Sequence, residues 1–153
     1  MRFIVVGRNE IERGIVVRTP YVVISIVDPK SRPARLRRSA GFRDELSLRF
    51  HDAEPNEDLP LPSEVVLMTQ DQAKAIWDFV LRYRDRVDTI VVHCEQGMSR
   101  SPAVATAICK VFGGNEEPFF REYAPNQYVY ELLLATAPNL GGEAGIPPRD
   151  EEA

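Results

Sequence analysis

The chain has 153 residues, a formal net charge of -4 and a sequence pI near 5.3, a size that suits one compact domain. This acidic balance excludes a global positive field that would hold nucleic acid or an anionic membrane, so we expect neither as a partner. The 16 Arg outnumber the 3 Lys, and forked guanidinium groups suit the oxygens of phosphates and carboxylates.

The first half of the chain is rich in predicted strands. Three segments are dense in Val and Ile and are separated by Gly, Asn and Pro, and we predict strands at residues 2–6, 14–18 and 21–27. Residues 33–39 predict a short Arg-rich helix, and residues 45–50 alternate apolar and polar side chains like a strand with one buried face. Residues 53–62 are acidic and rich in Pro, which predicts a loop.

The second half alternates predicted helices with one strand. Thr69 followed by Gln72 is a capping-box pattern, which predicts the start of a helix that continues to about residue 86. Residues 89–93 are mostly Ile and Val, which is typical of a strand buried on both faces in a parallel sheet. Residues 101–112 predict a helix with Ser-Pro at its start and Gly-Gly after its end. Two further helices are predicted at residues 117–123 and 126–136.

This mixture of strands and helices favours a single α/β sandwich, in which helices flank a central, mostly parallel sheet. We assign residues 1–140 to this domain and residues 141–153 to a flexible C-terminal tail. The apolar run at residues 1–6 is too short for a signal sequence or a membrane span, so we expect a cytoplasmic protein.

The two cysteines lie fifteen residues apart, a spacing that fits neither a disulfide framework nor a zinc site. We therefore expect no metal and no cofactor. Cys109 falls mid-helix among Ala and Ile, which predicts a core residue. Cys94 falls at the end of the predicted buried strand, which is the position of a reactive thiol.

The segment His-Cys-Glu-Gln-Gly-Met-Ser-Arg-Ser, residues 93–101, joins the predicted buried strand to the next helix. The backbone amides of such a tight loop, together with the N–H groups at the helix start, form a concave site for an anion. The same amide dipoles favour the nucleophilic thiolate form of Cys94. Arg100 can return over the loop and give two parallel hydrogen bonds to a phosphate.

We predict a phosphate-binding loop that consists of Glu95, Gln96, Gly97, Met98, Ser99 and Arg100. Gly97 permits its tight curvature. Ser101 can donate its hydroxyl hydrogen to the Cys94 sulfur and ease departure of the thiolate when a phosphocysteine breaks down. The expected ligand is phosphate or a phosphate-like anion such as sulfate or vanadate.

The pattern His-Cys-x-x-Gly-x-Ser-Arg-Ser resembles the signature loop of the protein tyrosine phosphatase superfamily, closest to its compact dual-specificity branch. The predicted strand before the loop and helix after it match the context that this motif requires. Residues 50–52, Phe-His-Asp, resemble the strand end that carries the general acid of the family. Residues 125–127, Pro-Asn-Gln, are similar to its penultimate-helix signature. The resemblance spans roughly residues 21–133 and implies a phosphatase-like fold.

The resemblance implies a cysteine-dependent enzyme that hydrolyses phosphate monoesters through a phosphocysteine on Cys94. The closest class is a protein tyrosine or dual-specificity phosphatase, and we expect a monomer that acts on a phosphorylated protein or peptide. His93 resembles a supporting position that hydrogen-bonds within the loop. Asp52 is implied as the acid that protonates the leaving oxygen and then as the base for water. Asp52 lies 42 residues before Cys94, a longer separation than dual-specificity phosphatases usually show. Asp58 lies 36 residues before Cys94 and is therefore the alternative acid.

Three other functions stay open on the sequence. The same chemistry can act on an inositol lipid, a nucleotide or an RNA 5' end, although Glu95, Gln96 and Met98 stand where relatives specific for inositol phosphates carry lysines. A phosphopeptide-binding module without catalysis would keep the anion loop. A rhodanese-type sulfurtransferase has a similar cysteine loop, usually shorter or without the trailing Arg-Ser. The arginines at residues 32–38 are expected to form a solvated face rather than to steer substrate.

Overall fold

The computed structural model describes residues 1–140, so the tail predicted at residues 141–153 lies outside the described residues. Within residues 1–140 the chain forms four strands, β1 (Arg2–Gly7), β2 (Tyr21–Val27), β3 (Phe42–Arg49) and β4 (Thr89–Cys94). It also forms five helices, α1 (Arg8–Arg13), α2 (Gln70–Tyr83), α3 (Arg100–Val111), α4 (Glu117–Glu122) and α5 (Gln127–Ala135).

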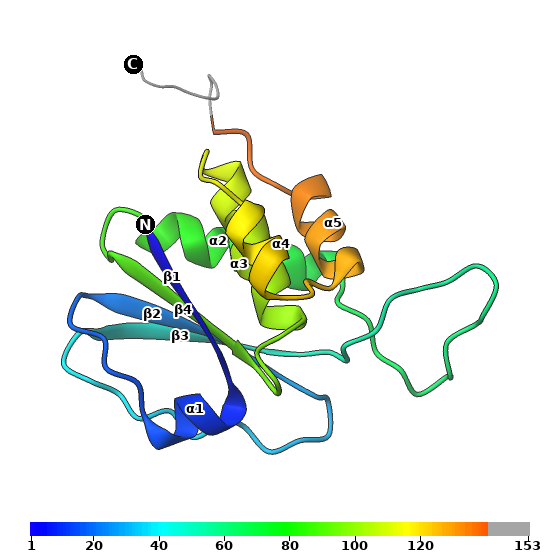
Figure 1. Ribbon diagram of the computed structural model, residues 1–153, viewed down its shortest axis with the longest axis horizontal. Helices are drawn as coiled ribbons and strands as arrows, with labels where there is room; N and C mark the ends of the chain where they lie inside the picture. Colours follow the sequence, from blue (N-terminus) through cyan, green and yellow to red (C-terminus); the bar gives the residue numbers. More distant parts are fainter. Residues whose placement is uncertain (141–153) are drawn as a thin grey trace.

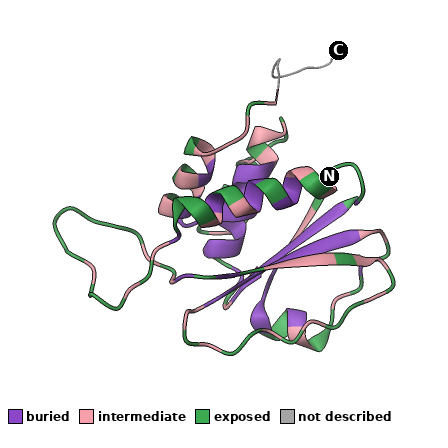
Figure 2. Ribbon diagram, turned by 180° about the vertical axis from the view of Figure 1, so that it is seen from behind, coloured by how far each residue is buried: buried purple, intermediate pink, exposed green. Residues whose placement is uncertain are grey.

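The four strands make one sheet in the order β1-β4-β2-β3, and every neighbouring pair is parallel (Figure 1). β4 lies between β1 and β2, and every residue of β2 and β4 is buried (Figure 2). Runs of Val and Ile without alternation are what a strand covered on both faces requires. The α/β class with a central parallel sheet, predicted from the sequence, is confirmed.

The two faces of the sheet carry separate apolar clusters. Val22, Ile24 and Ile26 of β2 belong to the larger cluster, whereas Tyr21 and Val23 belong to the smaller one. This split follows from the period of two along a strand, which turns successive side chains to opposite faces. Helices α2 to α5 cover one face and α1 covers the other (Figure 1).

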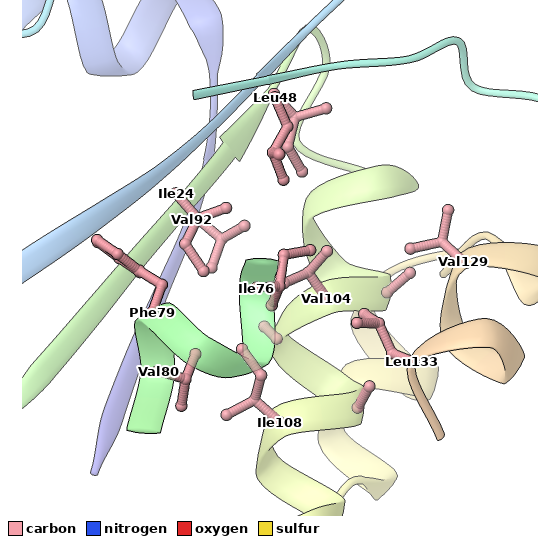
Figure 3. Close-up of a cluster of buried hydrophobic side chains, with 14 of the residues drawn as sticks. Ile24, Leu48, Ile76, Phe79, Val80, Val92, Val104, Ile108, Val129 and Leu133 are labelled. Atoms are coloured by element: carbon pink, nitrogen blue, oxygen red, sulfur yellow. The ribbon is translucent and has the colours of Figure 1, made fainter. Parts of the chain in front are cut away.

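The larger cluster is the main core, and Figure 3 shows its side chains converging between the sheet and the helices. Its members shown there come from two strands of the centre, one edge strand and three helices: Ile24, Leu48, Val92, Ile76, Phe79, Val80, Val104, Ile108, Val129 and Leu133. The indole N–H of Trp77 on α2 also donates to the Leu133 carbonyl on α5 at 3.0 Å, which joins the two outer helices.

Helix starts largely follow the predicted signals. The Thr69 side chain accepts from the Gln72 amide at 3.1 Å, and the Gln72 side chain accepts from the Thr69 amide at 2.9 Å, so the capping box is confirmed. The helix after the signature loop begins earlier than predicted, because Ser99 rather than Ser101 is its N-cap residue. Ser101 and Pro102 are therefore already inside its first turn.

Two predictions between β1 and β3 are wrong. Residues 14–18 form no strand and residues 33–39 form no helix, whereas residues 8–13, for which no element was predicted, form α1. Each of these segments is attached to the sheet by individual apolar side chains. Ile11 and Val17 belong to the smaller cluster, and the partly buried Leu36 packs against it. A six-residue helix has little stability of its own, so its sequence carries almost no helical signal.

The main core generates a stability prediction. Ile108 on α3 is fully buried, so Ile108→Ala leaves a cavity and should lower the free energy of unfolding by about 2–5 kcal/mol. Val16, which is 76% exposed, provides the control, and Val16→Ala should change stability by no more than about 0.5 kcal/mol. Urea unfolding followed by circular dichroism measures both. Equal losses in the two variants would contradict the position of the core.

Candidate active site

The candidate site lies where all four strands end. Because the strands are parallel, their carboxyl ends share one edge of the sheet, which is where open α/β sheets bind ligands. Three side chains follow strands β1, β2 and β3 at this edge, and they are Arg8, Asp28 and Phe50. Cys94 is the last residue of β4, in the centre of the sheet.

The Cys94 sulfur is surrounded by hydrogen-bond donors. The amides of Gly97 and Ser101 donate to Sγ at 3.3 and 3.4 Å, and the Ser101 hydroxyl oxygen lies 3.1 Å from the same sulfur. Cys94 is only 2% exposed. Donors that converge on one atom in a buried setting stabilise negative charge on that atom. The arrangement suits a thiolate.

His93 supports the start of the loop from behind. Its Nδ1 lies 3.3 Å from the Cys94 carbonyl oxygen and its Nε2 lies 2.6 Å from the Ser25 hydroxyl. A carbonyl only accepts, so Nδ1 carries the proton and Nε2 accepts from Ser25. Burial lowers the pKa of His93, which keeps the ring neutral near pH 7. The histidine therefore positions the backbone of Cys94 rather than supplying charge.

A close approach between two glycines shapes the loop. Gly97 has φ +74°, and a Cβ atom there would lie 2.6 Å from the Gly7 nitrogen at the end of β1. The Arg8 amide also donates to the Glu95 carbonyl at 3.0 Å. The loop is thus seated directly on the β1–α1 junction, at a distance that only glycine allows.

Arg100 is the one strongly buried side chain of the loop with a formal charge, at 4% exposure. Its Nη1 donates to the Asp28 carboxylate and to the Phe50 carbonyl, both at 2.7 Å. Its Nε is also buried but has no hydrogen-bond partner within residues 1–140. Buried donors are nearly always paired, so this nitrogen is a candidate to donate to a ligand.

Asp52 is held by the loop and by the start of α5. Its Oδ1 accepts from the Ser99 hydroxyl and from the Asn126 side-chain amide, each at 2.8 Å. Both donors are neutral, and neither contacts Oδ2. Asn126 also donates to the Ala53 carbonyl at 3.1 Å and caps α5 by accepting from the Val129 amide. This places the exposed carboxyl group of Asp52 at the rim of the loop.

An open pocket of about 500 Å³ lies between Asp52 and Arg100. Its walls include seven residues with polar side chains: Asp28, Ser31, His51, Asp52, Glu95, Gln96 and Arg100. Asp58 does not line it. The segment between β3 and α2, residues 50–69, contains Asp58 and projects from the body of the molecule (Figure 1). Of the two candidate acids, the structure brings Asp52 together with Arg100.

The remaining loop residues take different positions. The Glu95 carboxylate accepts from the buried Arg8 guanidinium at 3.1 Å, which ties the loop to α1. Gln96 is exposed and lines the pocket. Met98 is 47% exposed, and its carbonyl accepts from the Ala124 amide. Within residues 1–140 no group of three or more His, Cys, Asp or Glu is placed to hold a metal ion.

Two predictions concern residues outside the loop, namely Cys109 and the arginines at residues 32–38. Cys109 was expected in the core but is only partly buried, and burial and nearby Glu116 raise the pKa of its thiol. The arginines expected on a solvated face include Arg32 and Arg38, whose side chains are 55% and 61% exposed and pair with Glu12 and Glu45. Neither arginine lines the pocket.

The sequence interpretation missed Arg8, Asp28 and the contacts of Asn126. Asp28 had a usable signal, because it directly follows a seven-residue strand that is buried throughout. Residues at the carboxyl ends of parallel strands are candidates for a ligand site. Asn126 stood in a segment noted only for its family resemblance. Arg8 had no signal, because the contact with Glu95 joins residues 87 positions apart.

Comparisons with known proteins agree with this architecture at the level of fold. No protein-family model and no curated protein matches the chain by sequence. The crystal structure of human DUSP28 aligns with a TM-score of 0.52 and 16% identity over 88% of this chain and 90% of that one. A mouse putative dual specificity phosphatase, crystallised with zinc tungstate, aligns with a TM-score of 0.50 and 21% identity over 78% of this chain and 70% of its own.

These likenesses establish the fold. The chain has the compact α/β fold of the protein tyrosine phosphatase superfamily, in the form found in dual-specificity phosphatases. The resemblance inferred from residues 93–101 is confirmed at this level. Within residues 1–140 no helix has the length and apolar character needed to cross a membrane.

The close approach of Gly97 to Gly7 generates a prediction with a matched control. Gly97→Ala should abolish binding of inorganic phosphate, because the new Cβ displaces the loop from β1. Gly113 also has a positive φ, +82°, but no atom lies within 4 Å of its Cβ position. Gly113→Ala should therefore cost only local backbone strain, about 1 kcal/mol, and keep phosphate binding. Isothermal titration calorimetry distinguishes the two; equal phosphate affinity in both variants would refute the steric explanation.

Proposed function

We propose that this protein is a phosphate monoester hydrolase of the dual-specificity phosphatase type, which acts on phosphorylated proteins through a phosphocysteine on Cys94. The observation that carries the proposal is the set of donors around Sγ at the start of the loop, together with a buried Arg100 at the end of the same loop whose Nε has no partner within residues 1–140. A nucleophilic sulfur and an unpaired guanidinium donor on one loop suit a tetrahedral dianion.

In the first step of the proposed mechanism the Cys94 thiolate attacks the phosphorus atom. The S–P bond forms while the bond from phosphorus to the leaving oxygen breaks, and Asp52 gives its proton to that oxygen. Arg100 and the loop amides hold the nonbridging oxygens as charge develops on them. Support for the role of Asp52 comes from its position on the same pocket as Arg100.

In the second step water attacks the phosphocysteine. Asp52, now a carboxylate, takes a proton from the water, the O–P bond forms and the S–P bond breaks, releasing inorganic phosphate. The departing sulfur is negatively charged, and the Ser101 hydroxyl at 3.1 Å is well placed to donate to it. The protein thus returns to its starting state without any co-reactant other than water.

The acidic rim favours a protein substrate over a polyphosphorylated one. Asp28, Asp52 and Glu95 line the pocket, and among residues 1–140 Arg100 is the one Lys or Arg that does so. A second or third phosphate group would face these carboxylates at short range and be repelled. The cytoplasmic location and the monomeric state stay predictions.

The first functional prediction tests the nucleophile. The protein should hydrolyse 4-nitrophenyl phosphate without added metal and in the presence of EDTA. Cys94→Ser should abolish turnover while retaining phosphate binding, because the loop amides and Arg100 remain. Arg100→Lys should lower kcat/KM by at least about 10²-fold, since an ammonium cannot give two parallel bonds to phosphate.

Cys109→Ser is the matched control and should keep full turnover, because Cys109 does not line the pocket and its sulfur donates to the Asn115 carbonyl, at 3.6 Å. Undiminished activity in Cys94→Ser, or activity lost on chelation, would exclude the phosphocysteine mechanism. Phosphopeptide binding by a wild-type chain that shows no turnover would instead indicate a binding module.

The second functional prediction tests the acid. Asp52→Asn should lower kcat for phosphoserine peptides by about 10²-fold, the size typical of lost general acid catalysis. The loss should be smaller for 4-nitrophenyl phosphate, whose leaving group needs less protonation. Asp52→Asn should also flatten the high-pH limb of the rate profile and leave the low-pH limb unchanged.

Asp58→Asn serves as the control for the acid, because Asp58 lies on the projecting segment and does not line the pocket. It should leave both limbs of the profile intact. The reverse result would transfer the role to Asp58 and require residues 53–65 to fold over the pocket. If neither variant reduces turnover, the proposed acid step is wrong.

A further inference from the structure

We infer that Asp28 is a positioning residue, which orients the Arg100 guanidinium so that its Nε–Nη2 edge faces the bound phosphate. The inference rests on the proposed function and adds a residue to its machinery. Asp28 itself is not expected to touch the reacting atoms. Its role is to fix which pair of Arg100 nitrogens remains available.

The hydrogen bonds of Arg100 define that pair. Within residues 1–140 its side-chain hydrogen bonds all run through Nη1, to the Asp28 carboxylate and the Phe50 carbonyl at 2.7 Å each. Nε is buried and has no partner within residues 1–140, and neither of the two side-chain hydrogen bonds that Arg100 makes there uses Nη2. Nε and Nη2 form one edge of the planar fork, and this edge matches two oxygens of a phosphate. Asp28 therefore accepts from Nη1, which lies outside the edge that would bind the phosphate.

The segment that carries Asp28 is itself held in place by two further arginines. Arg49 at the end of β3 donates through Nη1 to the Asp28, Pro29 and Ser31 carbonyls at 3.3, 3.1 and 2.6 Å. Arg8 donates through Nη2 to the carbonyls of residues 32 and 33 at 2.7 and 3.0 Å. Pro29 further restricts Asp28 to an extended backbone. The carboxylate thus approaches Arg100 from a fixed direction.

The charge of Asp28 has two opposite consequences at this position. It stabilises a buried guanidinium, which is costly to leave unpaired. It also lines the pocket and would repel a phosphate dianion. A residue that merely competed with the ligand for Arg100 would accept from the nitrogens that the ligand uses. Asp28 accepts from Nη1 instead, which favours positioning over competition.

Steady-state kinetics on 4-nitrophenyl phosphate tests the inference. Asp28→Ala should lower kcat by about 10–100-fold while changing KM by less than about 3-fold, because a misdirected fork costs most in the transition state. Asp28→Asn keeps an oxygen that can accept from Nη1 and should recover most of the lost kcat. Asp78→Ala, at an exposed position on α2, is the control and should behave like the wild type.

A second measurement does not depend on turnover. In the wild type, inorganic phosphate should shift the NMR signal of the Arg100 Nε–H group downfield as this proton gains an acceptor. In Asp28→Ala the shift should be much smaller at saturating phosphate, and Asp28→Asn should restore it. A shift without any hydrolysis would reject the proposed function and still support the positioning role.

Three results would overturn the inference. The first is wild-type kcat in Asp28→Ala. The second is tighter phosphate binding together with faster turnover in Asp28→Ala, which would make Asp28 a competitor of the ligand. The third is an Arg100 Nε–H signal in the wild type that phosphate does not move. The third result applies even if Asp28→Ala fails to fold, because it requires only the native chain.

Discussion

The parallel order of the four strands is the constraint on which the site depends. The carboxyl ends of parallel strands lie at one edge of the sheet, so the residues that follow the strands meet there although they are far apart in the sequence. β4 is central, which sets Cys94 between the end of β1 and the end of β2. If β1 were antiparallel, Gly7 would lie at the opposite end of the sheet, and if β2 were antiparallel, Asp28 would lie there. In the first case the loop would lose its contact with Gly7, and in the second Arg100 would lose its ion pair with Asp28.

Two buried arginines stabilise this edge in different ways. Arg8 donates to Glu12, Glu95 and two backbone carbonyls, so its charge and four of its hydrogen bonds are satisfied inside the protein. Arg100 is satisfied at one nitrogen and leaves another buried without a partner within residues 1–140. A buried cation is stable only with compensating groups. The difference separates an arginine whose side-chain donors are used within the protein from one that keeps a donor for the anion of the proposed function.

The sequence was informative where local chemistry dictates structure. Residues 93–101 combine a strand end, a glycine at positive φ and a helix start, each with its own local signal, and the capping box at Thr69 follows from two residues alone. Residues 8–18 and 33–39 were predicted poorly, because single side chains such as Ile11, Val17 and Leu36 hold them to the sheet. The Asp28 and Arg8 contacts bridge 72 and 87 residues, and no local pattern encodes such pairings.

The two carboxylates of the pocket occupy environments that suit opposite tasks. Asp28 accepts from a guanidinium, a cation whose charge it balances, which suits the positioning role that we infer for it. Asp52 accepts only from a hydroxyl and a side-chain amide, and both bind the same oxygen. Its second oxygen accepts no hydrogen bond within residues 1–140, which is what the proposed acid step requires. An acid that must release and recover a proton needs such a free oxygen, and a residue that must orient a cation does not.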